Sequence, residues 1–234
     1  MNRNIFREYD IRGRVPEELN PRSAGLLGRA AGTYFREHGA RRIALGRDCR
    51  LSSPELCENL ADGLTSTGVD VIDLGVVPTP LLYHALFQLE VDGGVEVTGS
   101  HNPPGDNGFK LCLGRRTLFG SEIRRIGEIA ESGRFVRGTG RIEAGDIVRP
   151  YLDYMKENLR PGPVRRRVVL DCGNGVAGVA APEVFRAMGV EVDAIFCEPD
   201  GRFPHHHPDP TVPGNLRQLA AAVREKKADL GIGF

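Results

Sequence analysis

Apolar residues recur along the chain with two different periods, which predict helices and strands in turn. Between residues 21 and 37 the apolar side chains lie three or four positions apart, as on one face of a helix, and Asn20 stands where a capping residue is expected. Further helices are predicted at residues 53–64, 79–88 and 122–131, the first with Ser53 as its cap and Pro54 in its first turn. Short apolar runs predict buried strands at residues 42–45, 69–74, 93–97 and 109–113.

A second block of the same kind follows a connecting stretch. Residues 133–145 are rich in glycine and charge, so they are expected to link two domains, residues 1–145 and residues 146–234. In the second block, helices are predicted at residues 151–158, 178–187 and 215–226, and strands at residues 167–171, 189–196 and 228–232. Strands that alternate with helices of this length are typical of an α/β fold with a mostly parallel sheet.

The second block is small for a domain with a core of its own. Its last residues, ADLGIGF, stop at the carboxyl end of a predicted strand. Open parallel sheets bind their ligands at that edge. We therefore expect the chain to be part of a larger protein, with the second domain incomplete.

Composition excludes several classes of protein. The 234 residues carry 31 basic and 31 acidic side chains, which argues against a nucleic-acid or membrane-surface partner. The 5 cysteines are odd in number and contain no C-x-x-C pair, so we expect reduced thiols rather than a disulfide framework or a zinc site. The N-terminal stretch MNRNIFREYDIRGR has no apolar core, so no signal peptide is predicted, and we expect a cytoplasmic protein.

Residues 97–110, VTGSHNPPGDNGFK, place Ser100 on a turn directly after a predicted strand. No G-x-S-x-G elbow is present, and adjacent side chains in a turn usually point apart, so a Ser100–His101 dyad is not expected. Ser100 could instead carry a phosphoryl group, which needs nearby cations to hold it. The candidate cations are Arg12, His101, Lys110 and Arg47. The alternative is that Ser100 only makes hydrogen bonds within the turn, as serine does in most loops.

Three further motifs each allow two interpretations. YDIRG at residues 9–13 is either a surface strand end or an anion clamp built on Arg12. LDCGNGVAG at residues 170–178 has the G-x-G-x-x-G spacing of a dinucleotide site, but Asp193 falls inside the next strand, so a tight strand-to-helix turn is favoured over NAD. HHHPDP at residues 205–210 suggests metal binding, but consecutive side chains diverge and the prolines favour a stiff structural loop.

Taken in order, five motifs resemble the α-D-phosphohexomutase superfamily, and its bacterial phosphomannomutase/phosphoglucomutase branch in particular. They are FREYDIRG at 6–13, GRDCRLSSPEL at 46–56, TGSHNPPGDNGFK at 98–110, DCGNGVAG at 171–178 and PDGRFPHHHPDP at 199–210. The resemblance covers nearly the whole chain, and TGSHNPP is its most specific part. It implies a three-layer α/β/α first domain and most of a similar second domain.

The resemblance also implies a function for the loop. Family members interconvert hexose 1-phosphates and hexose 6-phosphates through a phosphoserine, here Ser100, and a 1,6-bisphosphosugar intermediate. Arg12 and Lys110 are implied to position the transferred group and assist proton transfer, with His101 beside them and Tyr9, Arg12 and Lys110 contacting substrate. Ser100 is implied to give one ligand to Mg²⁺, and glucose 1,6-bisphosphate is the implied activator.

The resemblance sets a limit as well. In the family, the strand that corresponds to ADLGIGF runs into an Asp-rich loop, D-G-D-x-D-R, that holds Mg²⁺, and two further domains recognise the sugar. None of these lies in the 234 residues, so we expect this chain alone to be inactive or nearly so. Two alternatives stay open, namely a non-catalytic fragment or binding module that keeps the fold, and a nucleotide-binding oxidoreductase that uses Gly173, Gly175 and Gly178.

Overall fold

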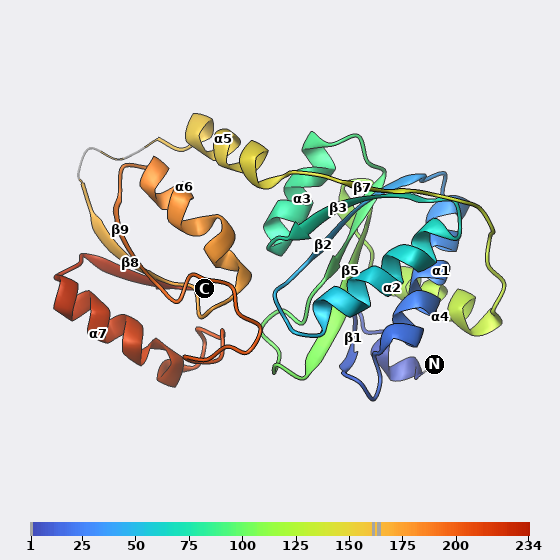
Figure 1. Cartoon of the computed structure of the whole chain (residues 1–234), viewed down its shortest axis with the longest axis horizontal. Coiled ribbons are helices and arrows are strands. Elements are labelled where there is room, and N and C mark those ends of the chain that lie inside the picture. The colour runs from blue at the N-terminus through green and yellow to red at the C-terminus, as the bar shows by residue number, and fades with distance from the viewer. Residues whose placement is uncertain (1, 161, 163–164) are drawn as a thin grey trace. The chain divides into compact units, whose positions relative to one another are not determined.

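A computed structural model describes residues 2–160, 162 and 165–234 of the chain. The chain divides into two compact units, residues 1–147 and residues 148–234, which are described separately (Figure 1). None of the helices in the described ranges combines the length and apolar character that a membrane crossing requires.

The first unit is built on a mixed sheet of seven strands in the order β1-β5-β4-β2-β3-β7, with β6 paired to β5. The strands β2, β3, β4 and β7 run parallel, whereas β5 is antiparallel to both β4 and β1. Their bounds are β1 (Ile11–Arg14), β2 (Arg42–Arg47), β3 (Asp70–Val76), β4 (Gly93–Val97), β5 (Asp106–Leu113), β6 (Arg116–Thr117) and β7 (Ile142–Ala144).

Helices cover both faces of this sheet, which makes three layers (Figure 1). The helices α1 (Pro21–Glu37), α2 (Ser53–Thr65) and α4 (Ser121–Ser132) share the main apolar core with the strands, and α3 (Thr79–Gln88) lies on the other side. A short 3-10 helix, η1 (Arg3–Ile5), precedes β1. Asn20 caps α1 as the sequence predicts, because its side chain accepts the Ser23 N–H while the Ser23 hydroxyl accepts the Asn20 N–H.

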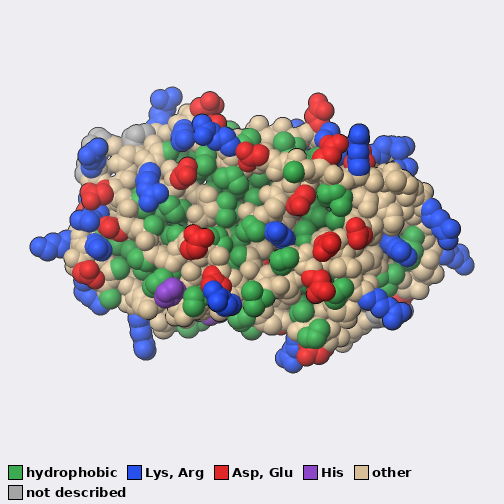
Figure 2. All heavy atoms as spheres, viewed as in Figure 1, with side chains coloured by type: hydrophobic (Ala, Val, Ile, Leu, Met, Phe, Trp, Pro, Cys, Tyr) green, Lys and Arg blue, Asp and Glu red, His purple; other side chains and the backbone are tan. Residues whose placement is uncertain are grey.

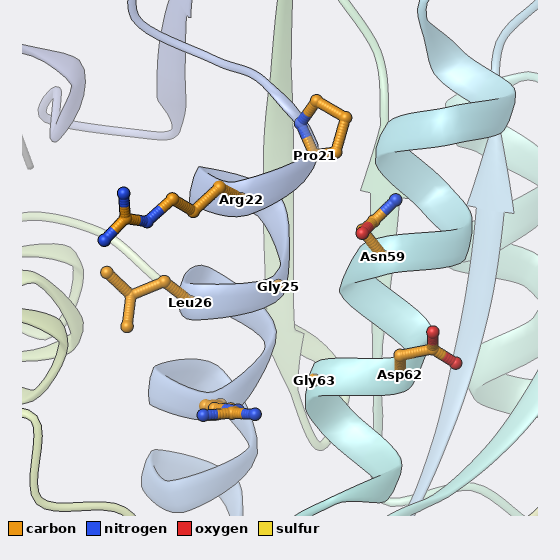
Figure 3. A pocket seen from close by; sticks show the side chains of 8 residues that line it. Pro21, Arg22, Gly25, Leu26, Asn59, Asp62 and Gly63 are labelled. Atoms are coloured by element: carbon orange, nitrogen blue, oxygen red, sulfur yellow. The ribbon is translucent and has the colours of Figure 1, made fainter.

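The helices α1 and α2 approach each other closely because glycines face each other at the crossing (Figure 3). A Cβ on Gly28 would lie 2.3 Å from the carbonyl oxygen of Leu60, and a Cβ on Gly63 would lie 2.8 Å from the Cα of Gly28. An open groove lies along the two helices and is lined by Pro21, Arg22, Leu26, Asn59 and Asp62, among others (Figure 3).

The second unit has a smaller, fully parallel sheet in the order β10-β8-β9. Its strands are β8 (Arg167–Asp171), β9 (Glu191–Ile195) and β10 (Leu230–Gly233). Its helices are α5 (Val148–Asn158), α6 (Ala181–Ala187) and α7 (Arg217–Lys226), with short 3-10 helices η2 (Val176–Val179) and η3 (Pro213–Leu216). The helix α6 packs beside β9, and α7 packs on β8 and β10.

The predicted fold class is confirmed, but three local predictions were wrong. The connecting stretch 133–145 contains β7, which pairs with β3 in the first sheet. The helix predicted at 178–187 is a 3-10 turn followed by a shorter α-helix, with Pro182 in its first turn. Ser53 does not cap α2, because its hydroxyl is hydrogen-bonded to Asp48 instead.

Candidate functional site

Ser100 lies on the loop between β4 and β5 and exposes its side chain. Its φ is 54°, a left-handed conformation that is rare outside glycine and recurs at functional sites. The Ser100 N–H donates to the Thr98 hydroxyl at 2.9 Å, so the backbone is held while the Ser100 hydroxyl faces outward. The loop therefore presents the hydroxyl in a conformation that its neighbours must maintain.

Arg50 is the residue that maintains the loop. Its side chain is only 1% exposed, and its guanidinium donates to four backbone carbonyls, including those of Ser100 at 2.9 Å and Asn102 at 2.7 Å. Glycine is required at position 99, because a Cβ on that residue would lie 2.5 Å from the Arg50 guanidinium. Sequence reasoning missed Arg50, because an arginine in a polar turn is usually solvated.

Asp48 ties this arginine to the start of the loop. Its Oδ2 accepts from the Thr98 hydroxyl at 2.8 Å, from the Gly99 N–H at 3.1 Å and from Arg50 Nε at 3.1 Å. Its Oδ1 accepts from the Arg50 N–H and the Ser53 hydroxyl. Asp48 is 7% exposed. The hydrogen bonds from these fixed donors offset the free-energy cost of burying its carboxylate.

Arg12 and Lys110 are brought together by strand register. Arg12 on β1 is opposite Gly108 on β5, and Lys110 is two residues further along the same face of β5. A Cβ on Gly108 would lie 2.4 Å from the Ile11 carbonyl oxygen, so glycine permits this close pairing.

Asp10 then holds both cations. Its Oδ2 lies 2.7 Å from Arg12 Nη2 and 3.6 Å from Lys110 Nζ. Arg12 Nη1 also donates to Asn102 Oδ1 at 2.5 Å, which attaches the pair of cations to the loop that carries Ser100. The arrangement can attract and orient an anion, because two cations share one carboxylate.

The remaining candidates differ in their placement. His101 Nδ1 is 3.3 Å from Ser100 Oγ, so the expectation that these adjacent side chains point apart was wrong. The left-handed φ of Ser100 is the reason, because it turns the two side chains toward each other. Tyr9 is 69% exposed beside Asp10. Arg47 ends β2 with Nη1 buried and without a hydrogen-bond partner in the described ranges, and no contact joins it to Ser100 there.

Glu96 is a second residue that sequence reasoning missed. It is fully buried in β4, opposite Lys110, and neither carboxylate oxygen has a hydrogen-bond partner among the described residues. Burial raises the pKa of Glu96 well above its usual value, the nearby Asp48 raises it further, and Lys110 opposes the shift. Gly46 leaves room for the carboxyl group, because a Cβ there would lie 2.4 Å from Glu96 Oε2.

In the second unit, the glycine motif forms a tight turn. Gly173 and Asn174 both have positive φ, and a Cβ on Gly178 would lie 1.8 Å from the Cys197 carbonyl oxygen, so this glycine is needed for packing. Asp193, the acidic residue considered for a ribose, is paired with Arg167 at 2.9 Å. This geometry favours the structural interpretation over the dinucleotide site.

The histidine loop is anchored to the same turn. His206 Nε2 lies 3.1 Å from each Asp171 carboxylate oxygen, and His205 Nδ1 lies 2.7 Å from Asn174 Oδ1. Phe196 stacks on the His205 ring with centroids 3.8 Å apart. These contacts hold the loop to the carboxyl end of β8.

The described residues do not form a magnesium site on their own. Among residues 2–160, 162 and 165–234, no three His, Cys, Asp or Glu side chains lie together in a way that could hold a metal ion. Near the loop, Asp10 is already paired with two cations, and Ser100 offers one oxygen. A magnesium ion at this loop would therefore need ligands beyond Asp10 and Ser100.

Comparison with the profiles of known families shows which protein family the chain belongs to. Residues 3–137 match the sequence profile of phosphoglucomutase/phosphomannomutase, alpha/beta/alpha domain I, and residues 149–234 match domain II of the same family. The chain belongs to the phosphoglucomutase/phosphomannomutase family. The resemblance noted in the five sequence motifs is thereby confirmed.

Individual relatives agree with the family profile. The chain is 45% identical to a phosphomannomutase/phosphoglucomutase of Pseudomonas aeruginosa over 99% of its own length and 50% of that protein's. It is 43% identical to a phosphoglucomutase of Neisseria gonorrhoeae over 51% of the latter. The crystal structure of a phosphoglucomutase/phosphomannomutase family protein from Burkholderia thailandensis superposes with a TM-score of 0.95 at 39% identity and covers 100% of this chain and 53% of that one. The chain thus spans about half the length of these relatives.

Proposed function

We propose that the chain carries the phosphoserine half of a phosphohexomutase that interconverts hexose 1-phosphates and hexose 6-phosphates. The observation that carries this proposal is the loop at Ser100. Ser100 has a left-handed backbone conformation and an exposed hydroxyl, and the buried Arg50 holds its loop. The Arg12–Lys110 pair is attached to the same loop through Asn102. Family membership supports the same reaction.

In the proposed reaction, Ser100 Oγ carries the phosphoryl group. A hydroxyl oxygen of a hexose monophosphate attacks phosphorus, the bond from phosphorus to Ser100 Oγ breaks, and a hexose bisphosphate forms. Lys110 would act as the base in its neutral amine form: it takes the proton of the attacking hydroxyl as that oxygen bonds to phosphorus, and a proton from the resulting ammonium passes to Ser100 Oγ as its bond to phosphorus breaks. The bisphosphate then turns over and returns its other phosphoryl group to Ser100 by the reverse step.

The neighbouring residues are assigned by their placement. Arg12 would stabilise the charge on the moving phosphoryl group, because its guanidinium is fixed between Asp10 and Asn102. His101, at 3.3 Å, would hydrogen-bond to Ser100 Oγ. The exposed Tyr9, with Arg12 and Lys110, would contact the phosphorylated sugar.

The wider protein would supply what the described residues lack. We propose that Mg²⁺ would bind an oxygen of the phosphoserine and would take its other ligands from outside these residues. The bound ion would offset negative charge on the phosphate. We further propose glucose 1,6-bisphosphate as activator and phosphorylated hexoses as partners, with no nucleic-acid or membrane partner. The proposed location is the cytoplasm, and the proposed domains are residues 1–145 and an incomplete second domain over residues 146–234.

The test is an activity assay on the full-length protein, since this chain spans about half the length of its relatives. Turnover of mannose 1-phosphate or glucose 1-phosphate is expected to be lost in Ser100→Ala and kept in Ser132→Ala, a serine at the end of α4. Full turnover by Ser100→Ala would refute the proposal.

A second candidate rests on the half-length match and on the absence of a metal cluster in the described ranges. By itself the 234-residue chain would be a fragment or binding module that keeps the fold without turnover. The same assay on this chain alone is expected to show no turnover, and an ordinary rate would refute this candidate.

A further inference from the structure

Two cysteines of the second unit bring their sulfur atoms together at the carboxyl end of its sheet. Cys172 directly follows β8, and Cys197 lies two residues beyond the end of β9. Their Sγ atoms are 2.6 Å apart, and both are free thiols. The proposed mutase reaction uses neither of them.

The backbone around the pair is fixed by its own hydrogen bonds. The Cys172 N–H donates to the Ile195 carbonyl at 3.2 Å, and the Asn174 N–H donates to the Phe196 carbonyl at 2.7 Å. Asn174 Nδ2 also donates to the Glu198 carbonyl at 2.9 Å. These contacts hold the residues after β8 beside the residues after β9, so the sulfur atoms meet without any rearrangement of the chain.

The two thiols are not equivalent. Cys172 is 1% exposed. The hydrogen bond between the two sulfur atoms, together with burial, raises the pKa of Cys172, and the same hydrogen bond lowers the pKa of Cys197. Cys197 is half-buried, so it is the more accessible of the two residues to a small oxidant. By contrast, burial raises the pKa of Cys57 to about 12 and that of Cys112 to about 11, which keeps both as unreactive thiols.

We propose that Cys172 and Cys197 form a redox modification site that a hydroperoxide converts to an intramolecular disulfide. The Cys197 thiolate attacks one peroxide oxygen, the O–O bond breaks, and the leaving oxygen takes up a proton as water or an alcohol. The resulting sulfenic acid on Cys197 is attacked by the Cys172 sulfur. The S–O bond breaks, water leaves with the Cys172 proton, and the peroxide has gained the two electrons that the thiols lost.

The new bond would close a loop between positions 25 residues apart in the sequence. It would join segments that hydrogen bonds already hold together, so it should stiffen the turn at residues 172–178 and leave the fold unchanged. In a reducing compartment the pair would return to two thiols, which makes the modification reversible.

The test treats the chain with hydrogen peroxide, blocks the remaining thiols with N-ethylmaleimide and maps the peptides by mass spectrometry. The expected result is a peptide linked through Cys172 and Cys197, with two fewer thiols alkylated and with recovery after dithiothreitol. The linked peptide should persist in Cys49→Ser and disappear in Cys197→Ser. Mapping the unmodified sequence needs no variant, so a folding failure in Cys197→Ser would not affect the result.

Two outcomes would overturn the proposal. One is full alkylation of both cysteines after a peroxide treatment that oxidises free glutathione in the same tube. The other is a disulfide that links either cysteine to Cys49 instead. As a second measurement, hydrogen exchange of residues 167–178 is expected to be slower in the oxidised chain, and faster exchange there would contradict a bond that fits the native geometry.

Discussion

Ser100 exposes its hydroxyl because its neighbours, rather than Ser100 itself, satisfy the polar groups of the loop. The four carbonyls that bond to Arg50 would otherwise turn inward without partners, and Asp48 fixes the start of the loop. At the scale of single residues, the chemistry of the loop therefore depends on a buried arginine that takes no part in the proposed reaction.

Replacing Arg50 tests this dependence. Arg50→Met keeps the bulk of the side chain but leaves Asp48 and the loop carbonyls unpaired, so we expect a loss of about 3 kcal/mol or more in the free energy of unfolding. The measurement is urea unfolding of the chain. The control is Arg149→Met, an exposed arginine on α5, which should change little. Equal stability of both variants would contradict the anchoring role.

Replacing Glu96 is expected to raise the free energy of unfolding, whereas replacing Arg50 is expected to lower it. Its carboxyl group is buried without a hydrogen-bond partner in the described ranges, so Glu96→Leu should raise the free energy of unfolding by about 1–3 kcal/mol at neutral pH. Glu58→Leu, at an exposed position of α2, is the control. A marked loss of stability in Glu96→Leu would show that the carboxyl group has a partner that this account lacks.

The same residue sets a pH dependence. Because the folded-state pKa of Glu96 is raised, the folded chain holds this proton more tightly than the unfolded chain does. The stability from the protonated group is fully present below the unfolded pKa of about 4.3 and is lost as pH rises from there toward the folded pKa. Unfolding measured from pH 4 upward should show this loss, and Glu96→Gln should remove that component of the slope.

The sequence motifs single out the residues proposed to react but not the buried residues beside them. Ser100, Arg12 and Lys110 were found because their chemistry and motif suggested a role, and their assignment stays a prediction. Arg50 and Glu96 could not be found, because a charged residue is expected at the surface unless its partners are known. The partners of Arg50 come from a segment far away in the sequence, at Pro103 and Asp106.

At the scale of elements, the position of α1 on α2 depends on glycines that the apolar pattern does not explain. Gly28 lies against the backbone of Leu60, whereas the nearest atom to a Cβ on Gly25 would be 3.6 Å away, at the carbonyl oxygen of Asn59. These two glycines lie one turn apart on the same helix, so the effects of replacing each by alanine can be compared directly.

Gly28→Ala should therefore force α1 and α2 apart and destabilise the first unit by about 1–3 kcal/mol. Gly25→Ala should be neutral or stabilise it by up to about 1 kcal/mol, because alanine favours a helix and has room there. Thermal unfolding of both variants is the measurement. If Gly25→Ala lost as much stability as Gly28→Ala, close packing would not be the cause.

Elements with strong local signals were predicted well. The helices α1 and α3 and the strands β4 and β8 have the bounds expected from caps, prolines and apolar runs. The strands β6 and β7 were missed because each is held by a partner strand rather than by its own apolar content. Likewise, Ser53 has the sequence of a cap but bonds to Asp48, a contact that a local pattern does not reveal.

At the scale of the whole molecule, the balanced charge agrees with the surface, where basic and acidic side chains lie interspersed on the face shown in Figure 2. The described part of the chain places the Ser100 loop in the first unit and a smaller parallel sheet in the second. The chain matches about half the length of each relative.

The central claim is that Ser100 carries the phosphoryl group. The most direct measurement incubates the whole protein with isotopically labelled glucose 1,6-bisphosphate and Mg²⁺ and then maps the peptide of residues 97–110 by mass spectrometry. We expect a labelled phosphate on Ser100 that is lost again when a hexose 1-phosphate is added. A bare Ser100, or a stable label on another residue, would contradict it.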